Sequence, residues 1–184
     1  MRFVPAVLAL SLCLAPVAAF AQTAGISGSP LPVQPYTLIY PEVMVTSGTT
    51  GGPVTINHPT LPLQCVLTVV PVEDTGWTAE GALAALDPAA VAAGWNQTFP
   101  GFTVGTSMVT SYQSNPALQY EGTSTGSESG GPITLIHTET VDAGNGYTLD
   151  CFYATEMAAE ARPIVDSIIA NFSTEQDAQP VVTP

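Results

Sequence analysis

The sequence predicts an α+β fold, an antiparallel β-sheet of about six to eight strands with helices packed on its faces. The apolar run Cys65–Val70 is typical of a central strand whose two faces are both covered. Asn145-Gly146 lies between two strand-like runs and predicts the turn of a β-hairpin. Apolar residues at helical spacing between Pro163 and Phe172 predict a last helix that packs back on the sheet.

The N-terminal segment, residues 1–21, has the composition of a secretory signal peptide. Arg2 supplies a positive start, the run Phe3–Ala19 is apolar, and small residues precede a cleavage point after Ala21. The apolar run is short and is interrupted by prolines, so we expect no membrane-spanning helix. The mature protein is therefore expected to be periplasmic or secreted.

A lipid anchor is the alternative fate of this segment, because Cys13 lies in its apolar core. Leu12 precedes that cysteine where a lipoprotein site usually requires a small residue, so we expect no anchor. Removal of the signal leaves roughly 160 residues, enough for one domain with its own core. We expect a disordered Gly/Pro/Ser linker over 22–35, a single domain over 36–173 and a disordered tail over 174–184.

The strands are expected in the following order along the domain. Tyr36–Tyr40 and Val43–Thr46 predict a broken pair of strands with a bend at Pro41. Alternation and turn residues predict further strands at 53–58, 63–71, 102–113, 117–122, 132–141 and 146–154.

Three helices are expected. Thr78 can cap a helix over 79–86, and Asp87-Pro88 is a cap and first-turn pair for a second helix over 89–95. Arg162-Pro163 predicts the start of the last helix, because proline is tolerated in a first turn and not in a helix interior.

The cysteines predict a disulfide. Cys13 leaves with the signal peptide, so Cys65 and Cys151 remain as an even pair in an oxidising compartment. A bridge between them would close a long loop and stabilise the fold by roughly 4 to 5 kcal/mol in the chain-entropy model. Two buried free thiols are the alternative.

The charge balance excludes two classes of partner. The chain has no lysine, and after residue 21 Arg162 alone faces 15 carboxylates, which gives a formal charge of −14. Such a surface repels nucleic acids and anionic lipids. It could dock a basic partner or cations, but the carboxylates are scattered along the chain, which favours a role in solubility.

An internal similarity predicts a repeated β-β-α unit. Gly51–His58 and Gly130–His137 share two glycines, a proline, a threonine and a histidine at matching positions, and each precedes a cysteine-bearing strand. With only two copies, this is a duplication within one domain rather than a repeat array.

The two histidines that end these copies, His58 and His137, are the candidate metal ligands. Carboxylates such as Glu139 or Asp142 could complete a site. The alternative is that each imidazole lies at a strand end and bonds to backbone or water, because no metal-ligand spacing supports the site. No sequence motif predicts a cofactor.

The sequence also lacks the local motifs of a catalytic nucleophile. There is no G-x-S-x-G elbow, so a hydrolase would need a serine, a histidine and an acid assembled only by the fold. We therefore expect a protein that is not an enzyme.

The mature chain resembles the PsbP-like family of αβα sandwiches, which includes photosystem II extrinsic subunit-like and DcrB-like proteins. The resemblance spans about 36–173 and rests on four features: Tyr36–Pro41, the strand Cys65–Pro71, the hairpin arm Gly146–Cys151 and the helix Pro163–Phe172. The absence of nucleophile, cofactor and metal motifs favours a non-enzymatic binding or assembly-accessory protein, with an envelope protein or a small ligand as its partner. The family shares no catalytic set, so no site residue is carried over.

Overall fold

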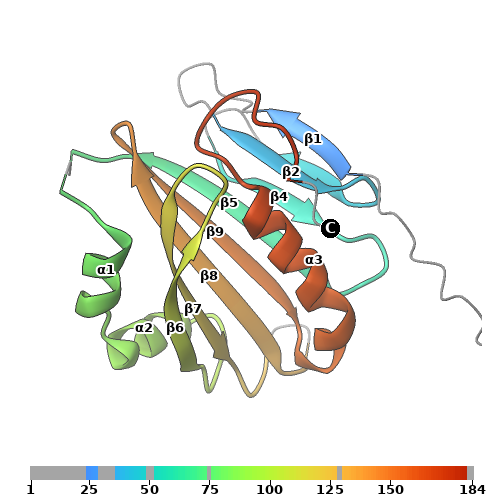
Figure 1. Ribbon diagram of the computed structural model, residues 1–184. Helices are drawn as coiled ribbons and strands as arrows, with labels where there is room; N and C mark the ends of the chain where they lie inside the picture. Colours follow the sequence, from blue (N-terminus) through green and yellow to red (C-terminus); the bar gives the residue numbers. More distant parts are fainter. Residues whose placement is uncertain (1–23, 29–35, 49–51, 74–75, 128–129, 182–184) are drawn as a thin grey trace, which may run out of the picture.

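The computed structural model describes residues 24–28, 36–48, 52–73, 76–127 and 130–181. Its centre is a seven-stranded antiparallel sheet with the spatial order β3-β4-β5-β9-β8-β7-β6 (Figure 1). The strands, in chain order, are β3 (Val45–Gly48), β4 (Val54–Asn57), β5 (Leu63–Pro71), β6 (Thr103–Ser111), β7 (Pro116–Thr123), β8 (Ile133–Asp142) and β9 (Asn145–Ala154). The predicted antiparallel sheet is confirmed.

A second, two-stranded sheet pairs β1 (Ala24–Gly28) with β2 (Thr37–Pro41). Two expectations are corrected here. The segment 22–35 is not wholly a disordered linker, because the backbone of β1 pairs along the whole of β2. In addition, the strands on either side of the bend after Pro41 are not a pair, since β2 pairs with β1 whereas β3 pairs with β4.

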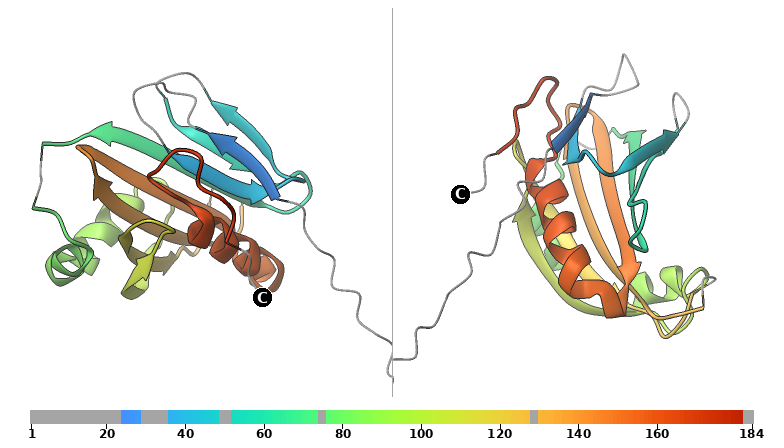
Figure 2. Two further views of the ribbon diagram at one scale, coloured as in Figure 1. Left: turned by 45° about the horizontal axis from the view of Figure 1, so that its top comes forward. Right: turned by 90° about the vertical axis from the view of Figure 1, so that its right-hand side faces the viewer.

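Helices cover both faces of the large sheet, as the second view of Figure 2 shows. One face packs against α3 (Ala158–Asn171) and β2, and this interface forms the larger core. The other face packs against α2 (Pro88–Trp95) through a smaller aromatic cluster, and α1 (Ala79–Ala85) lies against β6 and β7. Side chains of β9 alternate between the two, because successive residues of a strand point to opposite faces.

The first two helices begin where their capping residues predict. Thr78 Oγ1 accepts a hydrogen bond from the Gly81 amide at 3.0 Å. Asp87 Oδ1 accepts bonds from the amides of Ala89 and Ala90 at 2.9 and 3.3 Å. Each cap satisfies amides that have no partner within the helix.

The predicted start of the last helix is wrong. A short 3-10 helix, η1 (Thr155–Met157), leads directly into α3 at Ala158, so Pro163 lies inside the helix. Pro163 has no N–H to offer the Ala159 carbonyl. The turn before it nevertheless forms because Ala161 is fully buried against the sheet, and packing outweighs the lost hydrogen bond.

The hairpin between β8 and β9 turns two residues earlier than predicted. Its register pairs Asp142 with Asn145, which leaves Ala143-Gly144 as the two-residue loop. Both loop residues have positive φ, 48° and 77°, as a type I′ turn requires. Asn145 is needed as a strand residue, because β5 extends to Pro71 and pairs with it.

The disulfide joins the two middle strands of the sheet. Cys65 on β5 lies directly opposite Cys151 on β9, their sulfurs are bonded, and their Cα atoms are 4.0 Å apart. Both residues are fully buried in the core under α3. The pairing agrees with the prediction from the sequence.

The two matched segments both form hairpin strands. Their matched side chains, however, face opposite sides of the sheet, and the helices that follow them pack on opposite faces. The β4–β5 and β8–β9 hairpins meet at the cysteine pair, where Ile56 lies opposite Cys65 and Ile136 lies opposite Cys151. The sequence match instead aligns Ile56 with Leu135, one residue away. A shift of one residue moves side chains to the other face, so Ile56 lies in the α3 core and Leu135 in the aromatic cluster.

The end of the chain packs against the domain as far as residue 181, which corrects the expected disordered tail for 174–181. Thr174 is buried and its hydroxyl donates to Asp142 Oδ2 at 2.7 Å. The Val181 amide donates to Asn171 Oδ1 at 2.6 Å.

The predicted signal peptide, 1–21, lies outside the described residues. None of the helices in the described part is long and apolar enough to cross a membrane.

Replacing both bridge cysteines with alanine should lower the free energy of unfolding by roughly 4 to 5 kcal/mol, because the unfolded chain regains the freedom of a long loop. Urea unfolding under non-reducing conditions measures the loss. Dithiothreitol should bring the wild type close to the Cys65→Ala/Cys151→Ala variant and leave the variant unchanged. A variant as stable as the oxidised wild type would show that the bridge is not stabilising.

Candidate functional site

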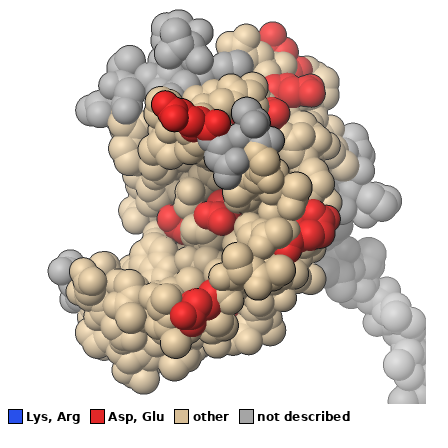
Figure 3. All heavy atoms as spheres, turned by 90° about the vertical axis from the view of Figure 1, so that its left-hand side faces the viewer, with Lys and Arg blue, Asp and Glu red and all other residues tan. Residues whose placement is uncertain are grey.

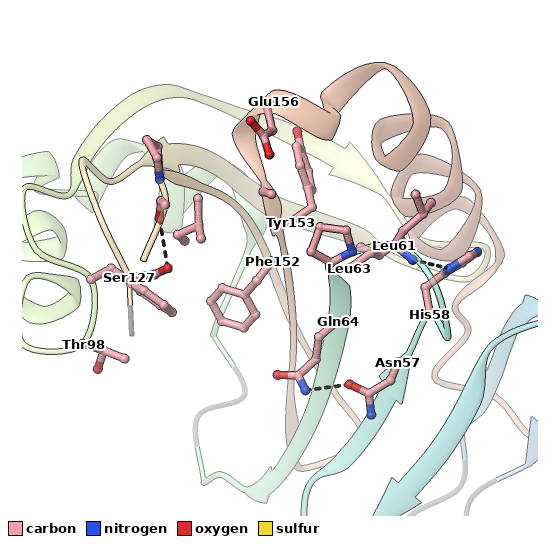
Figure 4. Close-up of a pocket in the computed structure, with 16 residues that line it drawn as sticks. Asn57, His58, Leu61, Leu63, Gln64, Thr98, Ser127, Phe152, Tyr153 and Glu156 are labelled. Atoms are coloured by element: carbon pink, nitrogen blue, oxygen red, sulfur yellow. Dashed lines mark hydrogen bonds between the residues drawn. The ribbon is translucent and has the colours of Figure 1, made fainter. Parts of the chain in front are cut away.

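A cleft lies at one end of the sheet, beside the β4–β5 loop (Figure 4). Its volume is about 740 Å³. One wall is the end of β4 with the loop 58–62, and the other is formed by the loops after α2 and before β8. The end of β9 and the start of η1 close it, so four separate segments of the chain converge there.

Aromatic side chains line the inner part of the cleft. Phe152 points to the sheet face opposite α3 and is only half-buried. Its ring lies 5.2 Å from that of Phe99 and 5.8 Å from that of Trp95, measured between centroids. A half-exposed aromatic surface of this kind can bury apolar groups of a ligand.

Asn96 holds the loop that carries Phe99. Its Nδ2 donates to the carbonyls of Ala92 and Phe102 at 2.8 and 3.2 Å, and its Oδ1 accepts from the Phe102 amide at 2.9 Å. The Phe99 amide also donates to the Trp95 carbonyl at 2.7 Å. The loop is thus tied to both α2 and the start of β6.

Polar groups lie at the opposite wall and the mouth. Gln64 Nε2 donates to Asn57 Oδ1 at 2.7 Å across the β4–β5 pair, and both side chains border the cleft (Figure 4). Among the described residues that line it, Glu156 is the one carboxylate, and none is a lysine or an arginine. The described part of the cleft therefore combines an apolar interior with hydrogen-bonding amides and a carboxylate at the mouth.

His58, one of the two predicted site histidines, lines this cleft but has a structural contact. Its Nδ1 accepts hydrogen bonds from the amides of Leu61 and Thr60 at 3.0 and 3.3 Å. These bonds close the loop between β4 and β5, so the imidazole shapes one wall. This is the bonding to backbone that the alternative interpretation of the sequence described.

His137, the second histidine, lies in a buried charged cluster on β8. Nδ1 is 2.7 Å from Asp150 Oδ1 and Nε2 is 3.4 Å from Glu139 Oε2. The ring stacks on Tyr120 with centroids 4.3 Å apart, and the Trp95 indole donates to the Tyr120 hydroxyl at 2.8 Å. The cluster thus joins α2 to the sheet.

The two carboxylates determine the charge of this imidazole. Burial alone would lower the pKa of His137, but hydrogen bonds to Asp150 and Glu139 and their negative charges outweigh it and raise the pKa to about 9. At neutral pH the ring is therefore an imidazolium that donates from both nitrogens. It has no nitrogen lone pair to offer a metal ion unless it first loses a proton.

The fold does not bring the two histidines together. His58 follows β4 and His137 lies on β8, three strands away, which is about 14 Å at the usual strand spacing. Asp142, a proposed ligand, accepts the bond from Thr174 instead. Within the described ranges no three histidine, cysteine or acidic side chains form a group that could hold a metal ion. A hydrolase would need a serine beside a histidine, but the hydroxyl beside His58 is that of Thr60, whose Oγ1 lies 3.5 Å from His58 Nδ1.

The acidic side chains are spread over the surface. Figure 3 shows them in separate groups, some within a hollow, and shows no described lysine or arginine on that face. Arg162 is the one such residue in the described part of the chain. It bonds to Glu121 and Asp166, each at 2.7 Å.

Apart from His58, the residues that form the cleft were not predicted from the sequence. Phe152 carried a signal, since it is an aromatic residue out of phase with the buried positions Leu149, Cys151 and Tyr153. Asn96 and Phe99 carried none, because their role depends on contacts between a loop, α2 and β6.

Comparison with known proteins gives no match by sequence, neither to a family model nor to a curated protein. By structure, the chain is similar to cyanobacterial PsbP (CyanoP) from Synechocystis, with a TM-score of 0.61, 10% identity and coverage of 86% of this chain and 95% of that one. The fold is PsbP-like. The Ran-binding protein Mog1p of Saccharomyces cerevisiae gives a TM-score of 0.55 at 5% identity, covering 85% of this chain and 97% of that one.

A structure from Bacteroides thetaiotaomicron gives a TM-score of 0.51 at 9% identity, with 78% of this chain aligned to 45% of that one. At these identities the similarity establishes the fold, and the resemblance seen in the sequence is confirmed at that level. A similarity in fold at such low identity carries no information about the cleft or the His137 cluster.

The His137 cluster should make stability depend on pH. The folded pKa, about 9, exceeds the unfolded value of about 6.5. The stabilisation is therefore complete below about pH 6.5 and is lost as pH rises through about 9, with a total of up to about 3 kcal/mol.

Urea unfolding at several pH values between about 6 and 9.5 tests this expectation. His137→Gln should remove most of the dependence, whereas His58→Gln, the matched control, should keep it. An unchanged pH profile in His137→Gln would show that the imidazolium does not contribute.

Proposed function

We propose that the protein is an exported, non-enzymatic binding module that holds an apolar segment of a partner protein in the cleft beside the β4–β5 loop. The observation that carries the proposal is the half-exposed Phe152 and Phe99 surface within a cleft of about 740 Å³. Such a volume accommodates a few side chains of a peptide. A binding role also agrees with the implication of the PsbP-like fold, and one protein of that fold, Mog1p, is named as a Ran-binding protein.

Charge restricts the class of partner segment. Glu156 is the charged carboxylate at the cleft, and the chain after residue 21 carries a formal charge of −14. An acidic peptide or an anionic ligand would be repelled, whereas a neutral or basic segment would be attracted. The segment that fits is one with aromatic or aliphatic side chains flanked by lysine or arginine.

A displayed library of random peptides, selected against the immobilised protein, tests the cleft. We expect apolar peptides with basic flanks to be enriched. The variant Thr98→Trp places a bulky ring at the exposed mouth and should weaken these peptides by at least about tenfold. Gln97→Trp, on the same loop but outside the cleft, is the matched control and should bind as the wild type does.

Two results would contradict the proposal. Enriched peptides that bind Thr98→Trp as tightly as the control would place binding elsewhere on the surface. Enrichment of acidic peptides would contradict the charge argument. Thermal melting of both tryptophan variants verifies that each one folds.

Export is the second part of the proposal and rests on residues 1–21 and on the Cys65–Cys151 bridge, which suits an oxidising compartment. Intact-mass analysis of protein recovered from the periplasm or medium of an expressing bacterium should give a chain that begins at Gln22. A mass that retains Met1, or one that carries a lipid on Cys13, would overturn this assignment.

A further inference from the structure

The strand β6 (Thr103–Ser111) forms an open edge of the seven-stranded sheet. In the described structure it pairs with β7 and with no other strand. The pairing is interrupted once, between Val104 and Thr106, and is regular from Thr106 to Ser111. The outward N–H and C=O groups of such an edge are free to pair with another strand.

Apart from the irregularity between Val104 and Thr106, this edge lacks the features that usually protect an edge strand. The segment Thr103–Ser111 contains no charged residue and no proline, and Met108 is 50% exposed. The opposite edge, β3, has only four residues, Val45–Gly48. Natural proteins commonly protect edges by shortness, charge or proline, so β6 is the edge open to pairing and β3 is protected by its length.

Two carboxylates beside this edge are paired with the same arginine. Glu121 on β7 lies opposite Thr106, and Asp166 lies on α3. Arg162 bonds to both, so the one guanidinium of the described chain lies beside β6. A notch of about 240 Å³ between β6 and α3 is lined by Met108, Arg162 and other residues.

We propose that a second copy of this chain pairs with β6, edge to edge and antiparallel, to form a symmetric dimer with one continuous sheet. Met108 of each copy then lies over the seam, next to the notch of its partner. Each copy has a formal charge of −14 after residue 21, so self-association is favoured only where carboxylates stay out of the contact. The uncharged β6, whose two flanking carboxylates are bonded to Arg162, meets that requirement for both copies at once.

The proposed contact predicts an unusual salt dependence. The paired β6 strands contain no ion pair between the two copies. The carboxylates on the rest of the two surfaces repel each other. Added salt screens this repulsion and should strengthen the dimer, which is the opposite of the behaviour of an interface held by salt bridges. Because one strand pair with few side-chain contacts is a small interface, the dimer should be weak and reversible.

Sedimentation velocity on the purified protein, at concentrations up to about 1 mM and in low and high sodium chloride, tests the proposal. The wild type should shift from monomer to dimer with concentration, and more readily in about 0.5 M salt. Met108→Asp, which brings a carboxylate from each copy to the seam, should weaken the dimer by at least about tenfold. Met108→Leu should retain it.

Val45→Asp is the matched control, because Val45 is 60% exposed on the other edge strand. It adds the same charge and should leave the dimer unchanged. The proposal is overturned by a wild type that stays monomeric at the highest concentration in high salt, by a Met108→Asp variant that dimerises normally, or by a Val45→Asp variant that loses the dimer. Melting temperatures verify that each variant is folded, so a loss of dimer is not a loss of fold.

Discussion

The pairing of β5 with β9 is the contact on which the rest of the structure depends. It joins the β4–β5 hairpin to the β8–β9 hairpin, and the bridge Cys65–Cys151 fixes its register covalently at the centre. Because successive side chains of a strand point to opposite faces, this register decides on which face of the sheet each side chain of both strands lies. Leu67 and Leu149 then face α3, whereas Phe152 faces the aromatic cluster and the cleft.

The features that were predicted correctly from the sequence are those that depend on contacts between residues close together in the chain. Thr78 and Asp87 cap their helices by bonding amides two or three residues away, so a short window of sequence contains the whole interaction. The strands could also be predicted, because alternating β-branched residues indicate a strand whatever its neighbour is. The disulfide could be predicted because an even pair of cysteines, Cys65 and Cys151, is expected to be bonded in an oxidising compartment.

The features that the sequence did not predict depend on distant contacts. Asn145-Gly146 has a strong local preference for a turn, yet the pairing of Asn145 with Pro71 moves the turn to Ala143-Gly144. Pro163 indicates a helix start, but the burial of Ala161 extends the helix past it. The cleft was missed for the same reason, since it is formed by four segments whose positions depend on the strand order.

The position of β9 in the middle of the sheet has a consequence for how the chain can fold during synthesis. β5 is complete by Pro71, but its second neighbour begins only at Asn145, and the last residue of that strand is Ala154. The central pair closes across a sequence separation of 86 residues, which makes native pairing late and slow compared with local hairpins. Under the export that we propose, this order keeps the sheet from closing until nearly the whole sequence has emerged on the far side of the membrane.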